Sequence, residues 1–372
     1  MFNIKTTKQK VVDSINIMRY ICFVKQHQEM QMDEIIGLSE IAKLANTSTA
    51  AVNNWINRYS DFPSPVSQIQ AGKFYNCSQV ESWLRKKGKI MGAKVISFIN
   101  LKGGVAKTTT TVGVATILAG VHKKKVLVID LDPQTNCTTM LIGEDKWKEL
   151  NDQNYTLAAL FEDVINEKKD FHLDKTLQKN VSKIKDVKNL DLLPSSLKMI
   201  DVQDRLGAIP QGKFFANNPT EIIKRAIKPI INDYDFILID CPPNMGLITL
   251  NGLRISDAYI IPTIPDVLST YGIPQIITRV SEFSENIGED IICLGIVATK
   301  VRGQSKLHTR TIEQLEREKD AHFFKTKFYE NNQIGEAAEC IETSTLRQKW
   351  GYQGQYDRFD DFVKEILSTI GD

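Results

Sequence analysis

The feature that most constrains the fold is a glycine-containing loop set between an apolar run and a helix-forming segment. Residues 95–100, Val-Ile-Ser-Phe-Ile-Asn, form a short apolar run suited to a buried strand. Lys-Gly-Gly-Val-Ala-Lys-Thr-Thr follows at 102–109, and small or apolar residues then recur as far as residue 119. A strand, a glycine loop ending in Lys-Thr and a helix predict a loop that binds phosphate groups.

Each residue type in this loop suits phosphate chemistry. Gly103 and Gly104 let backbone N–H groups curl around phosphate oxygens, and the helix N-terminus adds its dipole. Lys107 supplies a positive charge to the β- and γ-phosphates, and the hydroxyl of Thr108 suits Mg²⁺. We therefore expect the nucleotide site to comprise Lys102, Gly103, Gly104, Val105, Ala106, Lys107, Thr108 and Thr109.

Two further apolar runs end in carboxylates. Residues 126–129 precede Asp130 and Asp132, and residues 236–239 precede Asp240. Carboxylates at the carboxyl ends of parallel strands lie at the ligand edge of a sheet. We expect Asp240 to hold a Mg²⁺-bound water beside the loop hydroxyl, so that the magnesium residues are Thr108 and Asp240. Asp130 is interpreted either as a structural cap or as a site residue.

Residues 38–59 predict two short helices joined by a tight turn, the pattern of a helix-turn-helix. Residues 66–75 alternate like a hairpin that turns at 71–73, and a capping box at residue 78 begins another helix. This stretch resembles the winged helix-turn-helix modules of MerR-like and excisionase-like regulators. Its polar face is interpreted either as a solvated surface or as a DNA-binding surface made by Thr49, Asn53, Asn54, Arg58 and Lys73.

The charge distribution favours a nucleic-acid face near the N-terminus. Residues 1–94 hold 13 Lys and Arg against 7 Asp and Glu, whereas the remainder holds 34 against 38. A solvated basic domain is the alternative explanation. The six cysteines form no CxxC pair and predict reduced thiols. The N-terminus lacks an apolar signal-peptide core and no apolar run reaches membrane-spanning length, so we expect a cytoplasmic protein.

The domain organisation follows from these segments. Apolar residues at helical spacing from residue 10 predict an N-terminal helix that either packs on its own domain or forms a dimer contact. We therefore expect an N-terminal helix over residues 1–36 and a winged helix-turn-helix domain over 37–91. A phosphate-loop domain with alternating strands and helices is expected over 92–372.

The phosphate loop departs from the strict pattern GxxxxGK[ST], because Leu101 and Ala106 stand at its two glycine positions and Lys102 is an additional lysine. With DxDPQ at 130–134 and IDCPP at 239–243, this loop resembles the deviant Walker A motif of the ParA/MinD family. Segments at 192–197, 248–253 and 332–337 resemble further family segments in the same order, so the resemblance spans about residues 93–350.

The resemblance implies a doubly wound, mostly parallel α/β sheet and an ATPase that uses ATP/ADP and Mg²⁺. In the family, the additional lysine reaches the phosphates of a second copy in a nucleotide-sandwich dimer, and the second switch aspartate activates water. The implied catalytic residues are Lys102, Lys107 and Asp132. Residues 264–266 depart from the usual family form, as does Ala106.

The implied function is a plasmid or chromosome partition ATPase. Such an enzyme forms a homodimer with ATP, coats nucleoid DNA without sequence preference and hydrolyses ATP when a ParB-type centromere-binding partner stimulates it. The N-terminal domain would bind an operator and repress its own operon. Basic residues also cluster in the last quarter of the chain, and they are interpreted either as a DNA-binding surface or as a solvated surface. They are Lys300, Arg302, Lys306, Arg310, Lys325 and Lys327.

Three alternative functions compete with partition. A MinD-like positioning ATPase needs a basic amphipathic C-terminal helix, but the segment at 357–367 is acidic, so we expect no membrane binding. A nucleotide-sensing transcriptional regulator would need no turnover, against which Lys102 and Asp132 argue. An iron–sulfur reductase would need paired cysteines, and the spacing offers none.

Overall fold

The computed structural model describes residues 35–45, 47–69, 72–87, 92–208, 218–317, 321–352 and 354–371. These residues form two compact units, one centred on residues 35–87 and the other built from residues 92–208 and 219–371. A helix is predicted over residues 1–36, and residues 1–34 of it lie outside the described residues. Its predicted end is wrong, because Ile35–Ile36 is a strand that pairs with residues 75 and 76.

The first unit is a small sheet with three helices. The sheet has the antiparallel order β1-β3-β2. The side-chain oxygen of Ser48 accepts a hydrogen bond from the backbone N–H of Ala51 at 3.2 Å, which caps the second helix. Phe62 packs edge-on against Tyr75 and Trp83 in the core. The elements are β1 Ile35–Ile36, α2 Leu38–Leu44, α3 Thr49–Arg58, β2 Ser67–Ile69, β3 Gly72–Asn76 and α4 Cys77–Lys86.

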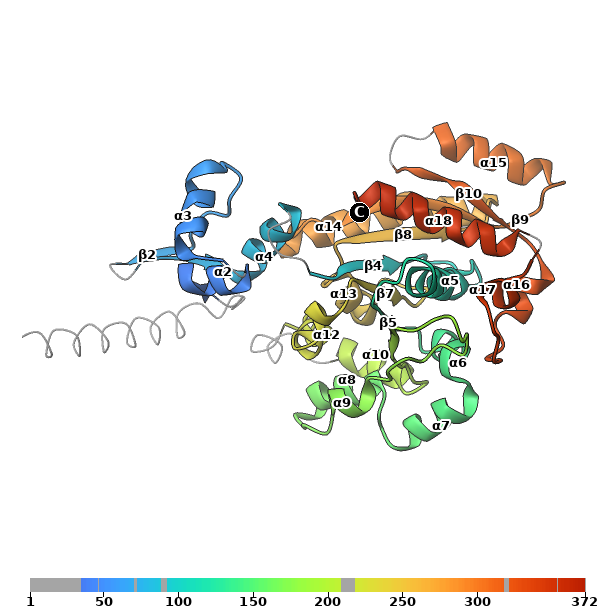
Figure 1. Cartoon of the computed structure of the whole chain (residues 1–372), viewed down its shortest axis with the longest axis horizontal. Coiled ribbons are helices and arrows are strands. Elements are labelled where there is room, and N and C mark those ends of the chain that lie inside the picture. Colours follow the sequence, from blue (N-terminus) through green and yellow to red (C-terminus); the bar gives the residue numbers. More distant parts are fainter. Residues whose placement is uncertain are drawn as a thin grey trace, which may run out of the picture. The chain divides into compact units, whose positions relative to one another are not determined.

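The second unit is built on a parallel sheet of seven strands, which confirms the expected α/β fold (Figure 1). The strand order is β10-β9-β8-β4-β7-β5-β6. The first strand of this unit, β4, therefore lies between β7 and β8, and the chain winds outward from it in both directions. The strands are β4 Lys94–Phe98, β5 Val126–Asp130, β6 Leu190–Leu193, β7 Phe236–Asp240, β8 Ala258–Thr263, β9 Ile292–Val301 and β10 Phe323–Tyr329.

Helices follow the strands and cover both faces of this sheet (Figure 1). Residues 143–190, between β5 and β6, contain three helices and then an irregular stretch. The helices are α5 Lys107–Gly120, α6 Asn136–Ile142, α7 Glu144–Asp152, α8 Leu157–Asn166, α9 Leu173–Thr176, α10 Met199–Ala208, α12 Ile222–Ile227, α13 Leu247–Leu253, α14 Val267–Ile287, α15 Lys306–Arg317, α16 Asn332–Glu336, α17 Leu346–Trp350 and α18 Gln355–Ile370.

Helix α5 packs tightly against α18 on one face of the sheet. A Cβ atom built on Gly113 would lie 2.1 Å from the ring of Phe359, so only glycine allows this approach. Trp350 of α17 donates its indole N–H to the hydroxyl of Thr116 at 2.9 Å. This packing fixes the helix that carries the phosphate loop.

Helix α13 covers the opposite face. A Cβ atom built on Gly252 would lie 3.2 Å from Ile239, whereas the neighbouring Leu238 belongs to the core under α5. Successive side chains of a strand point to opposite faces, so α5 and α13 sandwich β7 between them.

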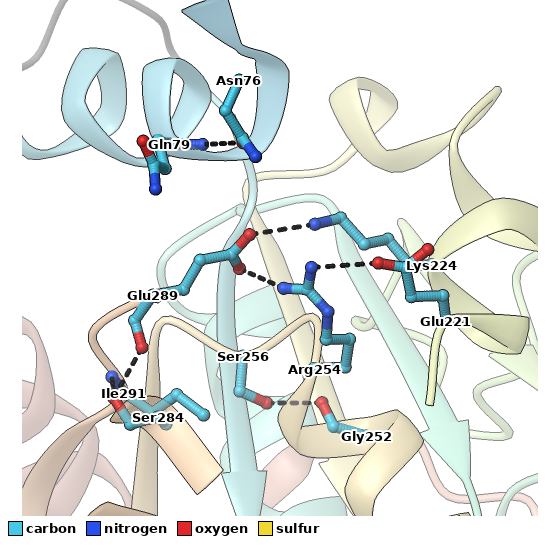
Figure 2. Close-up of polar contacts among 10 residues, drawn as sticks. All are labelled: Asn76, Gln79, Glu221, Lys224, Gly252, Arg254, Ser256, Ser284, Glu289 and Ile291. Atoms are coloured by element: carbon cyan, nitrogen blue, oxygen red, sulfur yellow. Dashed lines mark hydrogen bonds and ion pairs between the residues drawn. The ribbon is translucent and has the colours of Figure 1, made fainter. Parts of the chain in front are cut away.

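A buried charge network ties α12, α13 and the loop after α14 together. Arg254 donates to Glu221 at 3.0 Å and lies 2.6 Å from Glu289, and Lys224 also pairs with Glu289 at 3.1 Å (Figure 2). Arg254 is only 3% exposed, so both carboxylates are needed to compensate its burial.

Candidate active site

Three sequence motifs meet at the carboxyl edge of the sheet because their strands are neighbours in register. Phe98 of β4 pairs with Asp240 of β7, and Asp240 pairs with Asp130 of β5. The phosphate loop, the 130–134 segment and the 239–243 segment therefore leave the sheet side by side. This is the position at which open parallel sheets bind ligands.

The phosphate loop curls at two residues with positive φ. Gly104 has φ 75°, and Ala106 has φ 62° and ψ 29°, the left-handed conformation that favours glycine. A Cβ atom built on Gly103 or Gly104 would meet nothing within 4 Å, so the loop backbone is open to a ligand. This conformation explains why the strict motif GxxxxGK[ST] has glycine at the position of Ala106, and alanine occupies it here.

Two residues that the sequence did not single out fix this loop. Asn100 donates from Nδ2 to the carbonyl of Pro262 at 2.8 Å and accepts the backbone N–H of Lys102 at 2.9 Å. Thr299 donates its hydroxyl to the carbonyl of Val105 at 2.9 Å. The position of Asn100 at the end of a strand was a usable signal, whereas no local pattern points from residue 299 to the loop.

Lys107 begins α5 and is 6% exposed. Its Nζ donates to the carbonyls of Asn100 and Lys102, each at 3.2 Å. Burial lowers the pKa of Lys107, and the nearby carboxylates of Asp240 and Asp132 oppose that shift. The ammonium group is therefore held inside the loop, where phosphate oxygens would meet it.

Thr108 and Asp240 are in direct contact. The hydroxyl of Thr108 donates to Oδ2 of Asp240 at 2.7 Å, while Oδ1 of Asp240 is buried without a hydrogen-bond partner in the described structure. Burial raises the pKa of Asp240 well above its usual value, and Asp130 raises it further. A buried oxygen without a partner beside a hydroxyl fits a hydrated Mg²⁺, whose charge would favour the ionised carboxylate.

Asp130 acts as a cap, which is one of the two roles considered for it. Its Oδ2 accepts the backbone N–H and the hydroxyl of Thr138 at 2.9 and 2.6 Å, and its Oδ1 accepts the N–H of Asp132 at 3.1 Å. Burial raises the pKa of Asp130 to about 7. Asp130 therefore orders the backbone that carries Asp132 and the first turn of α6.

Asp132 itself lies beside the loop lysine. Its Oδ1 accepts the N–H of Gln134 at 3.0 Å, and the side chain is 8% exposed. Burial raises the pKa of Asp132, and the hydrogen bond from Gln134 and the charge of Lys107 oppose this. The remaining oxygen of Asp132 is thus a carboxylate acceptor near the phosphate loop.

Lys102, the additional lysine, is paired within its own chain. Its Nζ donates to both carboxylate oxygens of Asp266, at 3.0 and 3.3 Å. Val105 is buried and Thr109 is half-buried at the start of α5. The structure therefore gathers all the predicted nucleotide residues on one loop and the first turn of one helix.

The five predicted DNA-binding residues all lie on the surface of the first unit. Thr49, Asn53, Asn54 and Arg58 are exposed on α3, as expected. Lys73 is exposed too, but the predicted turn at 71–73 is wrong at Gly72 and Lys73. Both residues belong to strand β3, because Gly72 already pairs with Ile69 and Lys73 with Gln68.

The late basic residues differ in their surroundings. Arg302 and Lys327 form ion pairs with Glu330 and Glu316 at 2.6 and 2.8 Å. The others are exposed around β9, α15 and β10, namely Lys300, Lys306, Arg310 and Lys325. These exposed cations are the late basic residues that solvent or a polyanion can reach.

The cysteines of the described chain are free thiols, and none forms a disulfide. Cys137 and Cys241 are buried near the site, and burial raises the pKa of both. Neutral buried thiols are poor nucleophiles and poor metal ligands. Among the described residues, no helix is both long and apolar enough to cross a bilayer.

Comparisons with known proteins agree with this geometry. Residues 93–293 match the model of an AAA domain family. The chain is 30% identical over 245 residues to the sporulation initiation inhibitor protein Soj of Bacillus subtilis, a match that covers 66% of this chain and 87% of Soj. It is 25% identical over 230 residues to the chromosome partitioning protein ParA of Myxococcus xanthus, covering 62% of this chain and 73% of that protein.

Solved structures with the same fold include proteins with bound nucleotide. The structure of McdA from Cyanothece superposes with a TM-score of 0.58 at 21% identity, covering 74% of this chain and 99% of McdA. A plasmid partition protein from Borrelia burgdorferi bound to AMPPNP superposes with a TM-score of 0.55 at 20% identity, covering 74% of this chain and 99% of that protein. These likenesses extend the agreement from the motifs to the fold of the second unit.

Proposed function

This chain belongs to the AAA domain family and to the ParA/MinD-type P-loop ATPases, and from that premise we propose that it is a partition ATPase that uses ATP and Mg²⁺ to switch DNA binding on and off. ATP would pair two copies and load them on nucleoid DNA in the cytoplasm. A ParB-type protein bound to the cargo DNA would stimulate hydrolysis. The α3 surface would bind an operator and repress the chain's own operon.

The observation that carries this proposal is the contact between Thr108 and Asp240 at the base of an open phosphate loop. Mg²⁺, when bound, would supply positive charge to the phosphate oxygens, and Thr108 and Asp240 are the residues that would hold it. Backbone N–H groups of the loop and the ammonium of Lys107 would neutralise phosphate charge.

The carboxylate of Asp132 would orient the attacking water and accept its proton. Asp130 contributes by ordering the backbone N–H of Asp132. Lys102 would serve the phosphates of a second copy, so that two subunits hold together only while the γ-phosphate remains. The exposed cations near β9, α15 and β10 would then line a DNA-binding surface of the paired copies.

The experiment that tests this proposal compares wild type with Lys107→Ala in one assay series. Binding to non-specific duplex DNA is measured at fixed salt without nucleotide, with ADP and with ATP, beside ATP hydrolysis. We expect ATP to switch on DNA binding in wild type, and the variant to lose both the switch and hydrolysis. DNA binding that ignores nucleotide while hydrolysis persists would reject the partition function and favour a nucleotide-sensing regulator or a positioning ATPase.

A further inference from the structure

The ion pair between Lys102 and Asp266 joins two segments 164 residues apart. Both oxygens of Asp266 lie within hydrogen-bond distance of the Lys102 ammonium, and the two side chains are 36% and 29% exposed. Partial exposure keeps the pair within reach of solvent and of a competing anion. Asp266 therefore binds the same lysine that, in the proposed function, contacts the phosphates of a second copy.

Both ends of this ion pair are fixed to the end of β8. Asp266 donates its backbone N–H to the carbonyl of Ile264 at 2.7 Å, which forms a tight turn directly before α14. On the other side, Asn100 links the backbone N–H of Lys102 to the carbonyl of Pro262. These contacts within the chain hold the carboxylate of Asp266 beside Lys102.

A lysine ammonium is a point charge that must turn away from one anion to serve another. A triphosphate carries more negative charge than a single carboxylate, so it can compete for the lysine, but only after the existing pair breaks. Breaking the pair subtracts from the free energy with which two nucleotide-bound copies associate.

We propose that Asp266 is a positioning residue that holds Lys102 on its own chain until nucleotide is bound, and so raises the ATP concentration at which two copies pair. This inference rests on the proposed function, in which Lys102 serves the second copy. Partly exposed ion pairs contribute modestly, so the expected change in that concentration is about two- to fivefold.

The test uses the full chain with Mg²⁺ and AMPPNP, and follows pairing by sedimentation velocity as the nucleotide concentration is raised. We expect Asp266→Asn to lower the half-maximal concentration about two- to fivefold, and Asp266→Glu to restore it. The matched control is Asp357→Asn, which breaks the exposed ion pair with Arg347 at 2.7 Å and should leave pairing unchanged. Asp266→Ser, checked for folding by circular dichroism, provides a second neutral side chain.

Two further readouts separate positioning from a structural effect. Asp266→Asn should lower KM for ATP with kcat unchanged and leave the affinity for ADP unchanged. Its difference from wild type should also shrink as salt is raised, because salt screens the ion pair. If wild type pairs with nucleotide but Asp266→Asn and Asp266→Ser pair at the same or a higher concentration, this inference is overturned and the proposed function stands. If wild type does not pair at all, both are overturned.

Discussion

The hydroxyl of Thr108 donates to Oδ2 of Asp240 at 2.7 Å, so the first turn of α5 is bonded to the end of β7. The two residues lie 132 positions apart in the chain: Thr108 is in the first turn of α5, and Asp240 is the last residue of β7. The contact brings together the two residues of the proposed magnesium site.

Thr108→Ala should abolish ATP hydrolysis, because it removes both a proposed Mg²⁺ ligand and the donor to Asp240. Without nucleotide, the free energy of unfolding of the variant should also be lower by about 1–3 kcal/mol, because the buried carboxyl of Asp240 loses its hydrogen bond. Urea unfolding measures this difference. Thr108→Ser keeps the hydroxyl and should retain most of both properties. Equal activity of the alanine and serine variants would contradict the assignment.

Asp132→Ala should slow hydrolysis by roughly 100-fold or more, while nucleotide-dependent pairing persists. The reason is that Asp132 would act on the water and not on the phosphates. Steady-state phosphate release and sedimentation with ATP measure the two effects separately. Asp152→Ala, at the exposed end of α7, is the control and should change neither. Loss of pairing in Asp132→Ala would assign this residue to nucleotide binding instead.

The stability of the nucleotide-free protein should depend on pH through Asp130. Burial raises its pKa from an ordinary 3.8 to about 7, so between these values the folded protein binds more protons than the unfolded chain. Stability therefore falls as pH rises through this window and the contribution is lost above about 7. Asp130→Asn removes this titration.

Urea unfolding in EDTA, near pH 5 and near pH 8, measures the effect of Asp130→Asn. Wild type should lose more stability between the two pH values than the variant does. Parallel losses in both proteins would show that Asp130 titrates as an ordinary carboxyl group.

Gly113→Ala should destabilise the second unit by about 1–3 kcal/mol, because the added methyl group would overlap the ring of Phe359. Gly272→Ala is the matched control, since it also adds a methyl group in a helix but meets nothing within 4 Å. That control should be neutral or stabilising by up to about 1 kcal/mol. Similar urea midpoints for the two variants would show that α5 and α18 repack freely.

Arg58→Ala should weaken binding to the chain's own upstream DNA by roughly tenfold or more, with ATP hydrolysis unchanged. Arg58 is exposed on α3, the helix proposed to contact base edges. Lys43→Ala on α2 removes the same charge from the same unit and should have a smaller effect. Electrophoretic mobility shifts at fixed salt compare them. Equal losses of DNA affinity in the two variants would indicate general electrostatic attraction and would contradict recognition of the base sequence by α3.

The site was predictable where its chemistry is local. Lys107 and Thr108 follow a glycine loop, and Asp130, Asp132 and Asp240 end apolar runs, so strand and helix periodicity alone place them at one edge of a parallel sheet. The predicted end of the N-terminal helix and the predicted turn at Gly72 and Lys73 are wrong, because a two-residue strand and the length of a hairpin depend on which strands pair.

The sequence by itself determined the phosphate loop, the carboxylates and the alternation of strands and helices, because each is encoded by neighbouring residues. Only the tertiary structure decided that Thr299 holds the carbonyl of Val105, that Asp266 holds Lys102, and that Gly113 faces Phe359. Those contacts join residues more than 150 positions apart. They arise from strand order and helix packing, which fix distances between side chains that no local pattern relates.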